Sequence, residues 1–180
     1  GRCEAGLGLR AGLVREVEVD MGPAILEPFR IPVRSELGRF VDQPVSVGGV
    51  EYRITCVSMG NPHAVTFVDR TEGLDLEGIG PSFERHELFP DRINTEFVEV
   101  LSSERLRMRV WERGSGETMA CGTGACAAVV AGCLNGRCGR GGPVAVELRG
   151  GQLGITYRED GTVLMRGPAT TVFDGVIDFE

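Results

Sequence analysis

The sequence predicts an α+β fold built mainly from short strands. Three observations lead to this prediction: apolar and polar residues alternate over short runs, glycine and proline separate those runs, and only two segments have a helical pattern. Glycine makes up 27 of the 180 residues, about twice its usual share of roughly 7%, which indicates many tight turns. The length and the 42% of apolar residues suit one folded domain or two small ones.

The predicted strands follow one another along most of the chain. The first spans residues 17–21, where apolar residues alternate with charged ones. A hairpin follows, because two glycines between residues 45–47 and 50–57 supply the positive φ that a two-residue turn requires. In residues 106–111 the apolar side chains point to one face and the arginines to the other. The remaining predicted strands span residues 64–68, 95–101, 144–148, 154–157, 163–166, 170–173 and 176–179.

Two segments have the pattern of a helix. Residues 81–88 form a short one that opens with proline in its first turn. Residues 120–134 form a longer one, which is made of small residues, carries no charge and is apolar on nearly all sides. A helix that is apolar all round is buried, so we expect this one to lie against or inside the sheet.

Composition excludes several classes of function. The net charge of −7 argues against a nucleic-acid partner, and no apolar run approaches the ~20 residues of a membrane-spanning helix. All 19 basic residues are arginine, so the chain can form no Schiff base with pyridoxal phosphate and has no P-loop lysine. The six cysteines are too few for a disulfide scaffold, and we expect reduced thiols and a cytoplasmic protein.

Cys121 is the first candidate for chemistry, because it lies where a glycine-rich loop meets the start of the buried helix. A helix N-terminus offers unpaired N–H groups and a partial positive charge, which favour a thiolate. Gly122 would let a ligand approach the backbone, and Thr123 adds a hydroxyl group. The alternative is a buried structural cysteine, which is the commoner role of this residue type.

The other cysteines favour structural roles over a zinc site. At 3.6 residues per turn, Cys121 and Cys126 lie about 140° apart around the helix and cannot share a metal ion. Cys56, Cys126 and Cys133 fall in predicted core positions. Cys3 and Cys138 have no assigned role. The sequence therefore predicts no metal site.

Five further polar residues lie at strand ends, where sites are often built. Asn61 and His63 flank a proline in a tight turn, although a lone histidine is more often a surface or core residue. Asn94 begins a strand and has the alternative role of a turn residue. Glu112 and Arg113 end a strand, where they form either a solvated pair or a site in which the guanidinium binds a carboxylate.

Taken in order, three segments closely resemble diaminopimelate epimerases. They are Ser-Met-Gly-Asn-Pro-His at 58–63, Arg-Ile-Asn at 92–94, and the block Glu-Arg-Gly-Ser-Gly-Glu-Thr-Met-Ala-Cys-Gly-Thr-Gly-Ala-Cys at 112–126. The resemblance extends over the whole chain and includes Gly-Pro-Ala at 167–169. It implies a curved, mostly antiparallel mixed sheet wrapped round one central buried helix. It also implies an isomerase that converts LL- to meso-diaminopimelate, for lysine and cell-wall synthesis, with neither pyridoxal phosphate nor a metal ion.

The resemblance assigns a role to each candidate residue. Two cysteines of the family face the α-carbon of the amino acid from opposite sides, one as a thiolate base and one as a thiol acid. Cys121 corresponds to the second of these cysteines. The substrate-binding residues would be Asn61, Asn94, Glu112, Arg113, Gly122 and Thr123, and His63 and Glu112 would tune the pKa values of the cysteines.

The resemblance further implies that residues 1–180 are the C-terminal lobe of a two-lobed epimerase. The first lobe, with its own Cys-Gly-Asn-Gly motif, would precede residue 1, and neither Cys3 nor Cys56 has that motif. Residues 167–180 would return toward the first lobe, and the complete enzyme would be a cytoplasmic homodimer. We expect no epimerase activity from this lobe by itself.

Three alternatives to this assignment stay open. A related racemase of the histidine or proline type has a similar Cys-Gly-Thr-Gly segment but lacks the lead-in at 112–118. A non-catalytic lobe that binds an amino acid or a partner is the second. An isomerase of the phenazine-biosynthesis type shares the fold but not the cysteine pair, and the presence of Cys121 counts against it.

Overall fold

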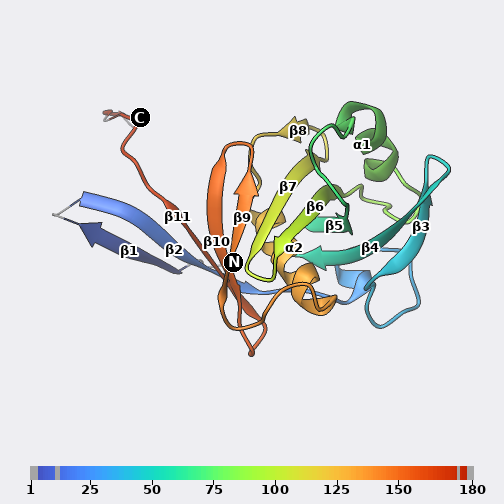
Figure 1. Ribbon diagram of the computed structural model, residues 1–180, viewed down its shortest axis with the longest axis horizontal. Coiled ribbons are helices and arrows are strands. Elements are labelled where there is room, and N and C mark those ends of the chain that lie inside the picture. The colour runs from blue at the N-terminus through green and yellow to red at the C-terminus, as the bar shows by residue number, and fades with distance from the viewer. Residues whose placement is uncertain (1–3, 11–12, 174, 178–180) are drawn as a thin grey trace.

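Eleven strands join into one sheet that curls around the helix α2 (Figure 1). The computed structural model describes residues 4–10, 13–173 and 175–177. The strands are β1 (Glu4–Arg10), β2 (Leu13–Pro23), β3 (Gln43–Val47), β4 (Val50–Ser58), β5 (Pro62–Phe67), β6 (Asn94–Ser102), β7 (Arg105–Glu112), β8 (Gly116–Thr118), β9 (Pro143–Leu148), β10 (Gly151–Tyr157) and β11 (Thr162–Pro168). The α-helices are α1 (Leu76–Glu84) and α2 (Gly122–Leu134), and one 3-10 turn, η1, covers Pro28–Arg30.

The sheet is mixed but mostly antiparallel. Its order is β1-β2-β11-β10-β9-β7-β6-β5-β4-β3, and β8 pairs with β7 off this path. The pairs β5–β6 and β7–β9 are parallel, whereas the other pairs are antiparallel. The predicted α+β fold, with its curved mixed sheet around one helix, is confirmed.

The hairpin β3–β4 forms where the sequence predicts it. Gly48 and Gly49 have φ values of 59° and 81°, which a two-residue turn requires and which other residues rarely adopt. The turn sets Val47 opposite Val50 and so determines the register of the whole pair.

Helix α2 is the centre of the main hydrophobic core. Residues 124–132 are all buried, and the helix packs against β4 to β7 and β9 to β11. Its alanines, glycines and valines allow the strands to approach closely, and each fully buried valine side chain contributes about 1.5–3 kcal/mol. The prediction of a buried helix is confirmed. No helix in the described ranges has the length and apolar character needed to cross a bilayer.

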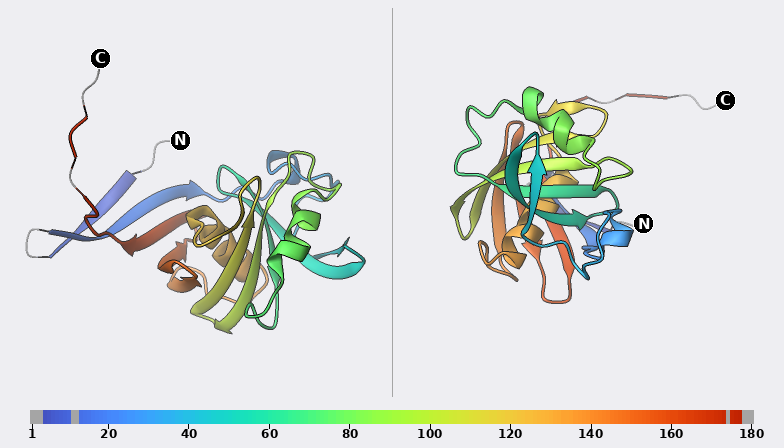
Figure 2. Two further views of the ribbon diagram at one scale, coloured as in Figure 1. Left: turned by 90° about the horizontal axis from the view of Figure 1, so that it is seen from above. Right: turned by 90° about the vertical axis from the view of Figure 1, so that its right-hand side faces the viewer.

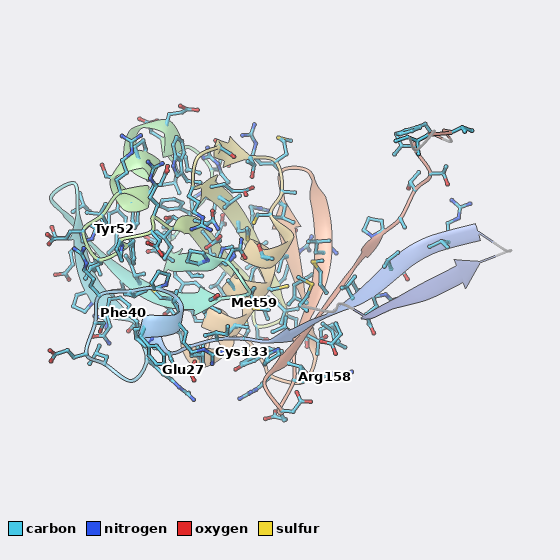
Figure 3. All side chains as sticks on the ribbon, turned by 180° about the vertical axis from the view of Figure 1, so that it is seen from behind. Glu27, Phe40, Tyr52, Met59, Cys133 and Arg158 are labelled. Carbon is cyan, nitrogen blue, oxygen red and sulfur yellow. The ribbon has the colours of Figure 1, made fainter. Side chains whose placement is uncertain are left out.

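A second hydrophobic cluster lies on the other side of β4, β5 and β6, under α1. Its members include Phe83 and Phe97, whose rings meet edge to face at 5.2 Å between centroids. Phe40 and Tyr52 of the same cluster lie at the end of the body that is farthest from the projecting strands (Figure 3). The sheet thus separates two cores, one around α2 and one beneath α1.

Helix α1 differs from its prediction in position. It spans Leu76–Glu84 and not residues 81–88, and Pro81 lies inside it. Asp75 is the N-cap, because its side chain accepts the N–H of Gly78 at 3.0 Å. This cap starts the helix one and a half turns before the proline, so Pro81 is not a first-turn residue and costs the helix one backbone hydrogen bond.

Strands β1, β2 and β11 form an arm that projects from the body (Figure 2). The chain after β11 is extended but forms no strand within 169–173 or 175–177. The prediction of a strand at 170–173 is therefore wrong, and so is that at 176–179 as far as residue 177, since residues 178 and 179 lie outside the described ranges. A strand needs a partner for its backbone, and the N–H of Ala169, which donates to the Arg15 carbonyl, makes the last such bond in the described part of the chain.

The contact of α1 with the indole of Trp111 leads to a first prediction. A Cβ atom on Gly80 would lie 2.2 Å from Cδ2 of Trp111, so Gly80→Ala must displace the ring. We expect the free energy of unfolding to fall by about 1–3 kcal/mol, although alanine favours helix over glycine by ~1 kcal/mol. Urea unfolding followed by the fluorescence of this single tryptophan measures the change.

Gly38→Ala is the matched control for this substitution. A Cβ atom there meets nothing within 4 Å, so stability should change by less than about 0.5 kcal/mol. A Gly80→Ala variant at least as stable as the unsubstituted chain would contradict the close packing of α1 on Trp111.

Candidate functional site

The candidate site lies where the turn before β5, the start of β6, the end of β7 and the start of α2 come together. The turn after β4 reverses at Gly60, whose φ is 98°, and leads through Asn61 into β5. The parallel pairing of β5 with β6 sets His63 opposite Asn94. The residues that the sequence analysis singles out in separate segments therefore meet at one end of the sheet.

Cys121 is the N-cap of α2. Its backbone is extended, with φ −139° and ψ 107°, and its sulfur accepts the N–H of Gly124 at 3.3 Å. The hydroxyl of Thr123 lies 3.5 Å from the same sulfur. The residue is 8% exposed. Since the N–H groups of Gly122 and Thr123 open the helix, they have no partner within it and form an anion-binding position beside the thiol.

A continuous chain of hydrogen bonds leads from this thiol into the core. The side-chain Nδ2 of Asn61 donates to the Thr123 hydroxyl at 3.2 Å, and the side-chain Oδ1 of Asn61 lies 3.0 Å from Nε2 of His63. Nδ1 of His63 in turn lies 2.7 Å from Oε1 of Glu96. His63 therefore reaches Cys121 only through Asn61 and Thr123.

The structure corrects the expected pKa of Cys121. Burial raises the pKa of this thiol above its usual value, and a negative charge on Glu96 raises it further where His63 does not balance that charge. Hydrogen bonds from Thr123 and from the Gly124 N–H lower the pKa without outweighing burial, and Glu112 adds a smaller increase. The helix terminus does favour the thiolate, as expected, but burial outweighs this effect because the sulfur is almost fully withdrawn from water.

Asn94, Glu112 and Arg113 form the opposite side of the site. The buried amide of Asn94 donates to the Pro62 carbonyl at 3.1 Å and accepts the backbone N–H of Arg113 at 2.9 Å. It thus joins the turn before β5 to the loop after β7. The carboxylate of Glu112 accepts the hydroxyl of Thr118. One guanidinium nitrogen of Arg113 donates to the Asp91 carbonyl at 3.1 Å and the side chain is otherwise open to solvent.

Two buried carboxylates that the sequence analysis missed organise this region. Glu84, at the end of α1, accepts Nε1 of Trp111 at 2.8 Å and the Gly114 N–H at 3.1 Å, and Arg92 lies 3.3 Å away. Glu96 contacts His63 as described above. The signal for Glu96 is a charged residue in the middle of a strand whose neighbours are apolar or buried on both faces.

The remaining cysteines have structural surroundings. Burial raises the pKa of Cys56 strongly and that of Cys126 to about 12. Cys133, near the far end of α2 (Figure 3), donates to the Gly139 carbonyl at 3.3 Å. Cys138 is half-buried, with its pKa raised to about 11 chiefly by burial, and Cys3 lies outside the described residues. Within those residues no three His, Cys, Asp or Glu side chains are grouped so as to hold a metal ion.

The hydroxyl of Thr123 is expected to set part of the acidity of Cys121. Thr123→Val removes a hydrogen bond that lowers the pKa of the thiol, so this pKa should rise by about one unit, the equivalent of one charge-assisted hydrogen bond. The pH dependence of iodoacetamide labelling, mapped to Cys121 by mass spectrometry, measures the shift. Thr123→Ser keeps the hydroxyl and should leave the midpoint in place. A Val variant that matches the Ser variant would show that the hydroxyl does not act on the sulfur.

Glu84 is expected to make stability depend on pH. Although burial raises its pKa, the hydrogen bonds from Trp111, Gly114 and Arg92 hold that pKa below its usual value in the folded chain. The stabilisation is therefore fully present above the pKa of the unfolded chain, near ~4.3, and is lost as the pH falls through the lower folded value. At pH 7 Glu84→Gln should reduce the free energy of unfolding by about 1–3 kcal/mol.

Urea titrations of Glu84→Gln and the unsubstituted chain at several pH values test this expectation. The difference between the two should shrink below about pH 4. Glu72→Gln is the control, because its carboxylate is 80% exposed and pairs with the similarly open Arg70, so stability should change little at any pH. A difference for Glu84→Gln that stays constant down to pH 3 would contradict the assigned role.

Comparisons with known proteins identify relatives that match most of this chain. The family model of diaminopimelate epimerase matches residues 55–172. The diaminopimelate epimerase of Desulfovibrio desulfuricans is 57% identical over 172 residues, which cover 92% of this chain and 59% of that protein. That of Acetivibrio thermocellus is 52% identical over 173 residues, which cover 96% of this chain and 61% of its own length. The chain thus spans less than two thirds of the length of the curated relatives it matches.

Solved structures show the same fold in more distant proteins. A hydroxyproline epimerase from Agrobacterium vitis, determined with bound trans-4-hydroxy-L-proline, superposes with a TM-score of 0.65 at 17% identity and covers 92% of this chain and 53% of its own. A probable proline racemase from Agrobacterium radiobacter gives the same TM-score at 11% identity and covers 96% of this chain and 58% of its own. Both likenesses show the fold alone. Because the family model matches well over half of the sequence, the chain belongs to the diaminopimelate epimerase family.

Proposed function

We propose that this chain carries one half of the active site of an epimerase that interconverts LL- and meso-diaminopimelate. The observation that carries the proposal is a thiol at the N-cap of a buried helix, beside two free helix N–H groups and joined by hydrogen bonds to Asn61 and His63. The family and the identities above 50% supply the substrate and the reaction.

The α-carboxylate of the substrate would bind at the start of α2. The N–H groups of Gly122 and Thr123 can donate to it, and the partial positive charge of the helix end stabilises the negative charge that builds up when the α-proton leaves. Gly122 lacks a side chain where Met165 of β11 packs, since a Cβ atom would lie 3.0 Å from its sulfur. This glycine therefore lets Met165 pack closely against the start of α2.

Cys121 exchanges one proton with the α-carbon in this proposal. Its raised pKa suits the protonated thiol, which gives its proton to the carbanion while a thiolate on the opposite face takes up the original α-proton. In the reverse direction Cys121 is the base, and the hydrogen bonds from Thr123 and Gly124 support its thiolate. The second cysteine would come from residues beyond this chain.

The distal end of the substrate would meet the other side of the site. Among the described residues the Arg113 guanidinium donates one hydrogen bond, to the Asp91 carbonyl, so its remaining N–H groups can bind a carboxylate in a planar fork. Asn94 fixes the backbone of Arg113, while Asn61 and Glu112 offer polar groups toward the ligand. His63 and Glu112 would modulate the acidity of the cysteines.

The chain would act as the C-terminal lobe of a two-lobed enzyme. Its coverage of the relatives supports this, and so do the exposed apolar side chains of the segment after β11, namely Val172, Phe173, Val176 and Ile177. We propose that residues 167–180 and the arm pack against an N-terminal lobe. We further propose that the complete enzyme is a cytoplasmic homodimer that needs no cofactor.

A chimeric enzyme tests the proposed function. The part of the Acetivibrio thermocellus epimerase that precedes its match to this chain is fused to residues 1–180, and LL-diaminopimelate is supplied in deuterium oxide. We expect deuterium at the α-carbon and meso product from the chimera, and neither from the isolated chain, because inversion requires an acid and a base on opposite faces of one carbon.

Two outcomes would contradict the proposal. Meso product from the isolated chain would show that the site is not divided between two lobes. A chimera that folds but neither turns over nor exchanges the proton would favour a lobe that only binds an amino acid. Cys121→Ser in the chimera is the matched control, and it should abolish inversion while leaving the circular dichroism spectrum unchanged.

A further inference from the structure

Glu96 forms a fully buried pair with His63, and neither the proposed reaction nor the candidate residues account for this carboxyl group. Both side chains are 0% exposed, and Nδ1 of His63 lies 2.7 Å from Oε1 of Glu96. The other carboxyl oxygen, Oε2, is buried and has no hydrogen-bond partner among the described residues. The carboxyl group lies under the first turn of α2, since a Cβ atom on Gly124 would come within 2.7 Å of Oε1. A buried acid in such a place needs an explanation, because leaving it charged and unpaired is costly.

The hydrogen bonds around His63 determine how many protons the pair holds. The side-chain oxygen Oδ1 of Asn61 can only accept, so Nε2 of His63 carries a hydrogen and donates it. The contact between Nδ1 and Oε1 requires one further hydrogen, which belongs either to the imidazole or to the carboxyl group. In both cases the pair carries no net charge, either as imidazolium with carboxylate or as neutral imidazole with carboxylic acid.

The same reasoning determines which group donates and which accepts in each hydrogen bond of the series that ends at the Cys121 thiol. Nε2–H of His63 donates to Asn61, and the amide of Asn61 then donates to the oxygen of Thr123. Because this oxygen already accepts a hydrogen from Asn61, its own hydrogen is free to point at the sulfur of Cys121, 3.5 Å away. A hydroxyl that donates to sulfur stabilises the thiolate.

We propose that Glu96 is a positioning residue for the reaction: by sharing one proton with His63 it keeps Nε2–H directed at Asn61 and thereby keeps the Thr123 hydroxyl directed at Cys121. The shared proton also removes the net negative charge that a lone carboxylate would place near a thiolate. The other ionisable groups around Cys121 are Glu112 at the end of β7 and Cys126 in α2. The catalytic consequence rests on the proposed function, whereas the protonation pattern does not.

The two histidines of the chain allow a direct test by nitrogen-15 NMR. His86 is an internal reference, since its Nδ1 accepts the Leu88 N–H at 3.2 Å and its Nε2 must therefore donate to the Ser46 carbonyl at 3.1 Å. His86→Gln assigns the signals. We expect a protonated Nε2 in both histidines. An unprotonated Nε2 in His63 would mean that His63 accepts a hydrogen bond from Asn61 and does not donate one, and this result would overturn the proposal.

Thiol labelling of two Glu96 variants provides the second test. Glu96→Gln keeps the shape of the side chain, and its amide can donate to Nδ1, so the pH midpoint of iodoacetamide labelling at Cys121 should stay unchanged. Glu96→Leu leaves Nδ1 without a partner, and we expect the midpoint to rise by about one pH unit. If Glu96 acts instead as a lone negative charge, both variants lower the midpoint, and that result overturns the proposal.

The proposal can still be tested if the Glu96→Leu variant does not fold. Thermal unfolding shows whether Glu96→Leu folds. If it does not, Glu96→Gln and the NMR signals provide the test. A change in the pH midpoint of Cys121 labelling in Glu96→Gln, in either direction, contradicts the shared proton. None of these measurements needs turnover. If the NMR and labelling results are as expected but the chimera is inactive, the proposed reaction is wrong while the inference about Glu96 still holds.

Discussion

The enclosure of α2 by the sheet is the constraint on which the rest of the structure depends. A helix without charge or large side chains can be surrounded by strands on nearly every side, and residues 124–132 are buried in this way. Its two ends are then the places where its unpaired backbone groups can meet other partners. At the N-terminal end the strands β5, β6 and β7 also end or begin, so the chemistry of the site follows from how the helix is packed.

This packing determines the acidity of the Cys121 thiol. Withdrawing Cys121 from water raises the pKa of its thiol, and the helix N-terminus does not compensate within this chain. The hydroxyl of Thr123 and the N–H of Gly124 act in the opposite direction. The acidity of the thiol is thus set by a balance between burial and two oriented donors, of which the Thr123 hydroxyl is held by Asn61 and, through Asn61, by His63.

The sequence predicts much of this arrangement and misses what long-range contacts determine. Alternation and turn glycines give the strands and the β3–β4 hairpin, and the uncharged stretch at 120–134 gives the buried helix, because these signals are local. The start of α1 depends on the Asp75 cap, which competes with a more conspicuous Pro81. Residues 170–173 are β-branched or aromatic, as in a strand, but in the described part of the chain no neighbouring strand pairs with them. The local sequence of a segment does not show whether a neighbouring strand is present to pair with it.

The site shows the same division between local and distant causes. Cys121, Asn61, His63, Asn94, Glu112 and Arg113 can be selected from the sequence because each lies at the end of an element or within a resembling motif. Glu84 and Glu96 cannot, since their roles arise from residues 27–33 positions away, namely Trp111, Gly114 and His63. Both carboxylates are buried, and both hold in place a group that itself touches the site. A buried carboxylate without a partner raises the free energy of the folded state. The need to pair Glu84 and Glu96 therefore fixes the conformation of the loop at 113–116 and the orientation of the His63 ring.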